Sequence, residues 1–134
     1  MRKNVGRVDH LGRFEAQILA IMRIVVGLLF ACHGAQKILG ILGGVRGGGH
    51  VSYFSLFGLA GIIELVGGLM IVLGIYAAYA AFIASGEMAV AYFMAHASRA
   101  FWPIQNGGEL AVLYCFVFLF IAAKGSGAWS LTRE

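Results

Sequence analysis

The chain has 134 residues, which is the length of one ordinary domain, but 60% of them are hydrophobic, only 12% are charged and the mean hydropathy is +0.87. A water-soluble core of this size could not bury so much apolar surface, so the composition excludes a soluble globular domain. The net charge of +4 does not indicate nucleic-acid binding, because the basic residues form no patch and do not alternate with aromatic residues on a polar surface.

Four apolar stretches predict four membrane-spanning helices, at about 16–41, 57–75, 77–96 and 107–124. Each approaches the roughly 20 residues that cross a bilayer. The sequence therefore predicts an all-α integral membrane protein, a four-helix antiparallel transmembrane bundle over residues 16–124. Residues 1–15 and 125–134 are expected to be cytoplasmic tails, since the first residues are polar and lack a signal-peptide cleavage pattern.

The connections between these helices differ in length. The first, from Gly43 to Phe54, is rich in glycine and is expected to be a flexible outer loop. The second is so short that Gly74, Ile75 and Tyr76 must turn the chain. Pro103 falls just before the fourth helix, where a missing N–H group costs least.

Basic residues in the flanks predict the orientation, because cytoplasmic flanks carry more Lys and Arg. One side has Arg2, Lys3, Arg7, Arg13, Lys124 and Arg133, and the other has Arg46 and Arg99. Both termini are therefore predicted to be cytoplasmic.

Many ionisable or polar side chains fall within the apolar stretches, where such residues normally face the bundle interior and mark function. At about 1.5 Å per residue, five groups from four helices lie in the outer half of the membrane. The candidate ligand-binding residues are His33, Lys37, Glu64, Glu87, His96, Arg99, Asn106 and Glu109. Arg23 lies about 21 Å deeper than Lys37 on the first helix and is expected to anchor the inner end by snorkelling.

Helical periodicity gives each side chain a direction. Lys37 shares a stripe with Arg23, Gly27, Phe30 and Gly34, and Glu64 shares a small-residue face with Gly61 and Gly68. In the fourth helix, Asn106, Glu109, Leu113, Phe116 and Phe120 align. These faces predict that Lys37, Glu64 and Glu109 point inward and meet near the outer rim.

Two interpretations of this cluster stay open. It could be an internal ion-pair network that fixes helix packing, as in a non-catalytic structural or assembly subunit. It could also be the polar end of a quinone pocket, in which His33, Lys37, His96 or Arg99 donates to a ring carbonyl and Glu64 or Glu87 exchanges protons. The expected apolar walls of that pocket are Phe30, Tyr53, Phe54, Tyr92, Phe101 and Trp102.

Other chemistries have weaker support in the sequence. A proton pathway through Glu64, Glu87 and Glu109 would need a transporter-like role. His33 and His96 differ by about 12 Å in estimated depth, which disfavours axial ligation of one haem, and no CxxCH motif is present. No two candidate metal ligands share an i, i+4 spacing, and Cys32 and Cys115 are expected to be small buried hydrophobes.

Several short motifs, taken in order, resemble the DoxX family of small four-helix bacterial inner-membrane proteins, which includes the small subunit of thiosulfate:quinone oxidoreductase. The likeness runs from Arg23 to Leu131. It includes Gly34-Ala-Gln-Lys37, Glu64-Leu-Val-Gly-Gly-Leu with Gly74, His96, Asn106-Gly-Gly-Glu-Leu110 and Gly125-Ser-Gly-Ala-Trp-Ser-Leu131. Ser126 and Thr132 stand where the family usually has proline and aspartate.

The resemblance implies a multi-pass protein of the bacterial inner membrane that works near respiratory or sulfur redox chemistry. It also implies association with other subunits of a membrane complex, or self-association, within membrane lipid. It does not fix a reaction, and it leaves open whether this chain is an enzyme or a quinone-binding subunit without catalytic residues. The chain has no rhodanese-like cysteine nucleophile, which weakens a thiosulfate assignment.

Overall fold

All regular secondary structure is helical in a computed structural model that describes residues 9–134. The elements are α1 (Asp9–Gly12), α2 (Glu15–Leu39), α3 (Leu56–Ile62), the π-helical turn η1 (Ile63–Gly67), α4 (Gly68–Leu73), α5 (Ala77–Ala95), α6 (Pro103–Asn106) and α7 (Glu109–Lys124). Arg2, Lys3 and Arg7, on which the predicted orientation partly depends, lie outside the described residues.

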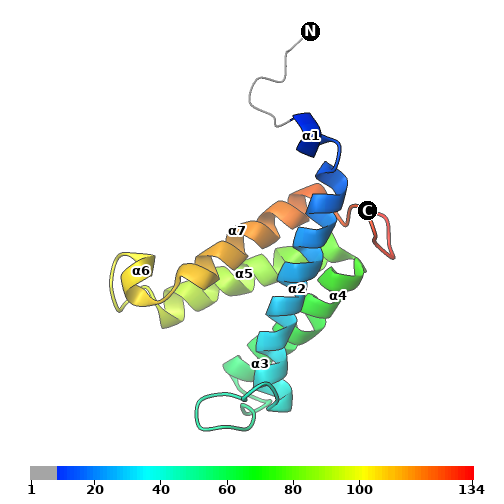
Figure 1. Ribbon diagram of the computed structural model, residues 1–134. Helices are drawn as coiled ribbons and strands as arrows, with labels where there is room; N and C mark the ends of the chain where they lie inside the picture. The colour runs from blue at the N-terminus through cyan, green and yellow to red at the C-terminus, as the bar shows by residue number, and fades with distance from the viewer. Residues whose placement is uncertain (1–8) are drawn as a thin grey trace.

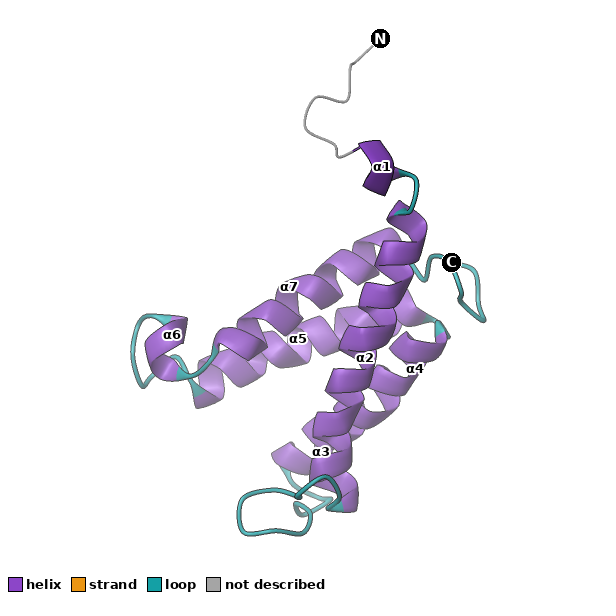
Figure 2. Cartoon of the chain, in the orientation of Figure 1, coloured by secondary structure: helices purple, strands orange, loops and turns teal. Residues whose placement is uncertain are grey.

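The helices form two hairpins. One pairs α2 with the continuous α3–η1–α4 segment, and the other pairs α5 with α7 (Figure 1). The hairpins meet where α4 turns into α5 and diverge toward the Gly-rich loop 40–55 and α6 (Figures 1 and 2). We call the convergent side, where residues 125–134 (the strap) also lie, the strap end, and we call the divergent side the loop end. The prediction of an all-helical fold is confirmed for the described residues. The short turn at residues 74–76 joins the two hairpins and does not make an antiparallel hairpin of its own, so the four helices do not run side by side over their whole length.

Three described helices are long and apolar enough to cross a membrane: Glu15–Leu39, Leu56–Leu73 and Ala77–Ala95. The last two agree with the predicted spans to within two residues at each end. The fourth predicted span coincides with α7, which has 16 residues and is thus about 24 Å long. The length of α7 falls below the usual 20 residues, so four crossings remain a prediction.

Special backbone conformations turn the chain between helices. The short turn predicted between the second and third helices is confirmed: Gly74 ends α4 and Tyr76 precedes α5, both in the left-handed region with φ of 66° and 44°. At the loop end, Gly40 ends α2 with φ of 66°. The Ser55 hydroxyl accepts from the Gly58 backbone N–H at 3.0 Å and so caps α3.

The core lies where both hairpins meet. Phe30 of α2 is fully buried and makes ring contacts with Tyr114 and Phe118 of α7, with centroids 5.4 and 4.7 Å apart. Small residues line the facing surface of α5, including Ala77, Ala81 and Ala84. The aromatic side chains of α7 therefore fill the space that the alanines of α5 leave open.

Residues 125–134 fold back against the turn between α4 and α5, and we call them the strap. The backbone N–H of Leu131 donates to the Leu73 carbonyl at 3.2 Å, and that of Thr132 donates to the Gly74 carbonyl at 3.0 Å. The Thr132 hydroxyl accepts from the Tyr76 N–H at 2.8 Å. This segment is thus attached to the helices by backbone hydrogen bonds.

Arg23 joins the strap to the hairpins. Its side chain is 2% exposed, and its guanidinium donates to the carbonyls of Ile71, Val72, Ala128 and Trp129 at 2.6–3.1 Å. The prediction that Arg23 snorkels to the membrane surface is wrong. The fixed N–H donors of the guanidinium match carbonyls at the end of α4 and in the strap better than they match a lipid surface.

Candidate functional site

The central contact of the site is an ion pair between the two helices of the first hairpin. Lys37 Nζ of α2 lies 2.6 Å from Glu64 Oε1 of η1. The Glu64 side chain is only 3% exposed, whereas that of Lys37 is 26% exposed. The prediction that these two residues meet is confirmed, and of the two side chains Glu64 is the more buried.

Glycines bring the two backbones close enough for this contact. A Cβ added to Gly34 of α2 would overlap the backbone nitrogen of Leu65 and lie 2.7 Å from the Gly61 carbonyl oxygen. Glu64 itself belongs to the π-helical turn, which re-aims the side chains of one turn and is frequent at functional sites. Close packing and the wider turn together direct Glu64 toward Lys37.

A second carboxyl group from α5 completes the cluster. Glu87 interacts electrostatically with both Glu64 and Lys37. One oxygen of each acid, Glu64 Oε2 and Glu87 Oε2, is buried and has no hydrogen-bond partner among the described residues. A single ammonium thus faces two carboxyl groups, and two acceptor positions stay open in an apolar region.

A cavity of about 320 Å³ lies beside this cluster and is lined by both hairpins. Its polar wall is made by His33, Lys37, Glu64 and His96. The remaining wall is apolar and includes Phe30, Phe57, Met88, Leu110 and Tyr114. We call this space the hairpin cleft. Its size is at the lower end of small-molecule pockets, and its mixture of apolar walls with a few polar groups is typical of them.

His96 has a defined hydrogen-bonding state at the end of α5. Its Nδ1 lies 3.1 Å from the Asn106 carbonyl oxygen, which can only accept, so Nδ1 carries the hydrogen. In the neutral ring, Nε2 is then an acceptor on a residue that lines the cleft. Asn106 contributes through its backbone, since its buried side chain bonds to Tyr92, Ala100 and Gly108.

His33 lies on the opposite hairpin from His96. Its ring packs edge-on against Tyr114, with centroids 6.1 Å apart, and both residues line the cleft. Sequence reasoning missed Tyr114, because α7 is apolar on all sides and offers no preferred face. Its spacing from the buried residues Ala111 and Phe118, by three and four positions, is the helical signal that could have identified it.

Two predicted site residues lie away from the cluster. Glu109 is exposed on the first turn of α7, and Arg99 is exposed in the turn after α5. The predicted convergence of Glu109 with Lys37 and Glu64 is therefore wrong. Glu109 was aligned with Asn106, but Asn106 belongs to α6, and the turn at Gly107 and Gly108 breaks the helical register between them.

The same break affects the predicted inner face of the fourth helix and the aromatic walls. Leu113, Phe116 and Phe120 are exposed, whereas Ala111, Tyr114, Phe118 and Ile121 are buried. Of the aromatic residues expected to line a pocket, Phe30 does so, but Tyr53, Phe54, Phe101 and Trp102 are exposed outside the cleft. Tyr92 supports the Asn106 side chain instead.

The two cysteines are free and half-buried, on α2 and α7. The Ser85 hydroxyl donates to the Cys115 backbone carbonyl at 2.7 Å, which links α5 to α7. Within residues 9–134, no group of three or more His, Cys, Asp or Glu side chains is arranged to hold a metal ion.

Comparisons with known proteins place the geometry in context. The sequence model of the DoxX family matches residues 18–97, which include Arg23, Lys37, Glu64 and Glu87. The chain is also similar to an uncharacterized protein of Haemophilus influenzae, with 40% identity over 130 residues that cover 95% of this chain and 97% of the relative. No solved structure matches.

Proposed function

The chain belongs to the DoxX family of membrane proteins, and from that premise we propose that it is a quinone-associated subunit whose hairpin cleft binds the quinone ring. In this proposal it crosses the bacterial inner membrane four times, with α7 as the short fourth span and both termini in the cytoplasm. The cleft then opens toward the outer leaflet, from which a lipid-soluble molecule enters between the diverging hairpins.

One observation carries the proposal: Glu64 lines the cleft while one of its buried oxygens has no partner among the described residues. A buried acceptor left unpaired costs on the order of 1–3 kcal/mol, and more for a charged group. A quinol hydroxyl supplies the missing donor. The oxidised ring presents carbonyl oxygens instead, which accept from Lys37 or from an N–H of His33.

The cluster also has the composition needed for proton exchange. Reduction of a quinone to a quinol takes up two electrons and two protons. A redox partner protein supplies the electrons, and Glu64 and Glu87 pass the protons, because each carboxyl group can hold or release one. His96 Nε2 is a further acceptor at the cleft wall.

A second function has its own support. The Lys37–Glu64 contact links two helices of one hairpin at 2.6 Å and can be a packing element alone. In that case the chain is a non-catalytic structural or assembly subunit, and its exposed apolar helix faces contact other proteins of a membrane complex.

The test is the quinone content of the protein purified in lipid nanodiscs from a quinone-containing bacterial membrane. We expect about one quinone per chain for the wild type, and at least a tenfold lower content for Glu64→Gln, which keeps the shape and removes the charge. The matched control is Glu109→Gln, because Glu109 is exposed and lies outside the cleft.

The melting temperature of each variant establishes that it is folded. A folded Glu64→Gln protein with the wild-type quinone content would refute the binding role of Glu64. A folded wild type without quinone, isolated as part of a large complex, would support the structural function instead.

A further inference from the structure

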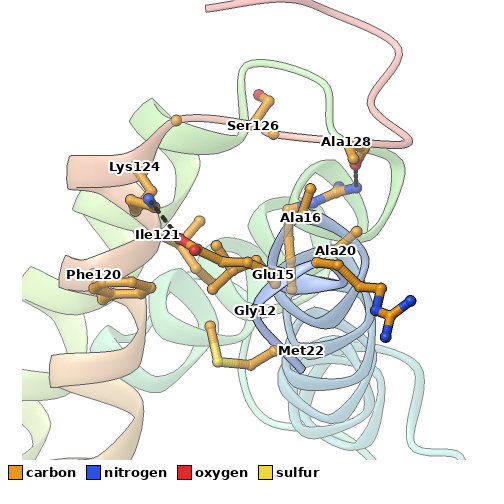
Figure 3. Close-up of a pocket in the computed structure, with 15 residues that line it drawn as sticks. Gly12, Glu15, Ala16, Ala20, Met22, Phe120, Ile121, Lys124, Ser126 and Ala128 are labelled. Atoms are coloured by element: carbon orange, nitrogen blue, oxygen red, sulfur yellow. Dashed lines mark hydrogen bonds and ion pairs between the residues drawn. The ribbon is translucent and has the colours of Figure 1, made fainter. Parts of the chain in front are cut away.

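A second cavity lies at the strap end, on the other side of Arg23 from the hairpin cleft. Its volume is about 470 Å³. It lies between the first half of α2 and the end of α7, and residues 125–128 of the strap close one side of it (Figure 3). We call it the strap cavity. It shares no lining residue with the hairpin cleft, so nothing proposed above uses it.

The walls of the strap cavity change from apolar to charged. Leu19, Ala20, Met22, Phe120 and Ile121 make an apolar wall. Arg13, Glu15 and Lys124 line it at the ends of α2 and α7. In Figure 3, Phe120 and Met22 lie on the side away from Lys124 and Ser126. A molecule that fills this cavity must therefore combine an apolar chain with a polar head.

The charges that line the cavity favour an anionic head. Arg13, Arg23 and Lys124 are cations, and Glu15 is the one carboxylate among the lining residues. Lys124 Nζ lies 3.6 Å from Glu15 Oε1, and both side chains are about half exposed, so that pair is weak. One carboxylate cannot balance three cations.

The hydrogen bonds of Arg13 and Arg23 do not neutralise these two guanidinium groups. The hydrogen bonds of Arg23 go to four neutral carbonyls, and its Nε is buried without a partner in the described part of the chain. Arg13 bonds to the backbone oxygen and the ring of His10 and lies over the Phe14 ring. Neither arginine has a described carboxylate partner, so the cavity has a net positive wall.

We propose that the strap cavity binds an anionic glycerophospholipid of the leaflet at the strap end. Its phosphate lies between Arg13 and Lys124, and one acyl chain follows the wall formed by Met22 and Phe120. Basic pockets between membrane helices bind anionic lipid headgroups by this combination of charge and apolar surface. A free phosphate would satisfy the cations but would leave the apolar wall without a contact.

The test uses the two tryptophans of the chain as reporters, since Trp129 is in the strap and Trp102 is next to α6. The Trp102→Phe protein is placed in nanodiscs of phosphatidylcholine that contain a minor fraction of either brominated phosphatidylglycerol or brominated phosphatidylcholine. Bromine quenches tryptophan fluorescence on contact. We expect stronger quenching of Trp129 by the anionic lipid, because each nearby basic residue favours it by about fivefold.

Charge variants distinguish a specific lipid site from a general attraction between the basic residues and anionic lipid. Adding Arg13→Gln and Lys124→Gln should reduce the quenching by phosphatidylglycerol to the level of phosphatidylcholine. Arg46→Gln with Arg99→Gln removes the same charge at the loop end and should leave the quenching of Trp129 unchanged. Equal quenching by both brominated lipids, or equal loss in both double variants, would overturn the proposal.

A final measurement distinguishes binding of the lipid from binding of its soluble headgroup. Glycerol phosphate added to the nanodiscs should not restore Trp129 fluorescence. Full restoration would show that the cavity takes a free phosphate ester, and it would overturn the assignment to a lipid. Melting temperatures in phosphatidylcholine nanodiscs identify any variant that fails to fold. If the Arg13→Gln, Lys124→Gln double variant does not fold, Lys124→Gln alone is tested in its place.

Discussion

Arg23 and Lys37 are two cations on the same side of α2, and the structure stabilises them in different ways. Arg23 donates to four backbone carbonyls at the strap end. Lys37 pairs with one carboxylate at the loop end, where two further carboxylate oxygens have no described partner. The first arrangement uses nearly every donor it has. The second leaves one buried oxygen each of Glu64 and Glu87 without a described partner, and Glu64 lines the hairpin cleft.

This difference separates architecture from function. A side chain that donates to several backbone carbonyls holds segments of the fold together, and its removal changes the fold. A cluster with open acceptors is costly to maintain in an apolar region unless a ligand or a proton completes it.

Arg23→Met should have the largest effect on stability. It removes a donor from four carbonyls. Those of Ile71 and Ala128 keep longer bonds from the Gly74 N–H at 3.3 Å and the Ser130 hydroxyl at 3.5 Å, so two carbonyls lose their described donor entirely. We expect a loss on the order of 4 kcal/mol, since each buried unpaired acceptor costs about 1–3 kcal/mol. Thermal unfolding in detergent measures the loss, and proteolysis should cleave the released strap. Arg99→Met is the control and should change stability by less than about 0.5 kcal/mol, because Arg99 is exposed. A stable Arg23→Met protein with a protected strap would contradict the structural role.

Lys37→Met should destabilise the protein by about 3 kcal/mol, because it leaves the Glu64 carboxylate buried without its cation. Adding Glu64→Leu should recover most of that loss, since replacing a whole buried pair with apolar residues is often neutral. Thermal unfolding of the single and double variants gives the coupling between the two residues.

The double variant also separates the two proposed functions. A binding site predicts that the stable double variant contains no quinone. A packing element predicts that it assembles and works like the wild type. A double variant that keeps both its stability and its quinone would show that the Lys37–Glu64 pair is not part of a quinone site.

Gly34→Ala should have a smaller effect, about 1–3 kcal/mol, as is usual when a methyl group is forced into close packing. The new Cβ would push η1 away from α2 and so weaken the contact between Lys37 and Glu64. Both the melting temperature and the quinone content should fall. Gly86→Ala is the matched control: a Cβ there meets nothing within 4 Å, and we expect a neutral result or a gain of up to about 1 kcal/mol. Similar losses in both variants would mean that the glycine contact is not what positions Glu64.

The sequence was sufficient to predict the features that depend on local signals. The length of each apolar stretch located the helices, and Gly74 identified the short turn. Lys37 and Glu64 could be predicted to meet because each lies on a helix face marked by small residues, where backbones approach closely.

Features that depend on distant contacts could not be predicted in this way. The acceptors of Arg23 in the strap lie 105 and 106 residues away, where no local pattern links them to Arg23. The direction of Glu109 depended on whether α6 and α7 are one helix, which hydrophobicity alone does not decide in a chain that is apolar throughout. The divergence of the two hairpins likewise depends on packing between helices rather than on any local pattern.

The position of Arg23 has a consequence for the order in which the protein is made. The ribosome synthesises Arg23 early, Ile71 and Val72 about fifty residues later, and Ala128 and Trp129 only near the end of the described chain. The first helix must therefore enter the lipid before half of its arginine's acceptors exist. Newly inserted helices therefore stay incompletely fixed until residues 128 and 129 emerge, and during that period a membrane protease or insertase can distinguish chains without the strap from chains that have it.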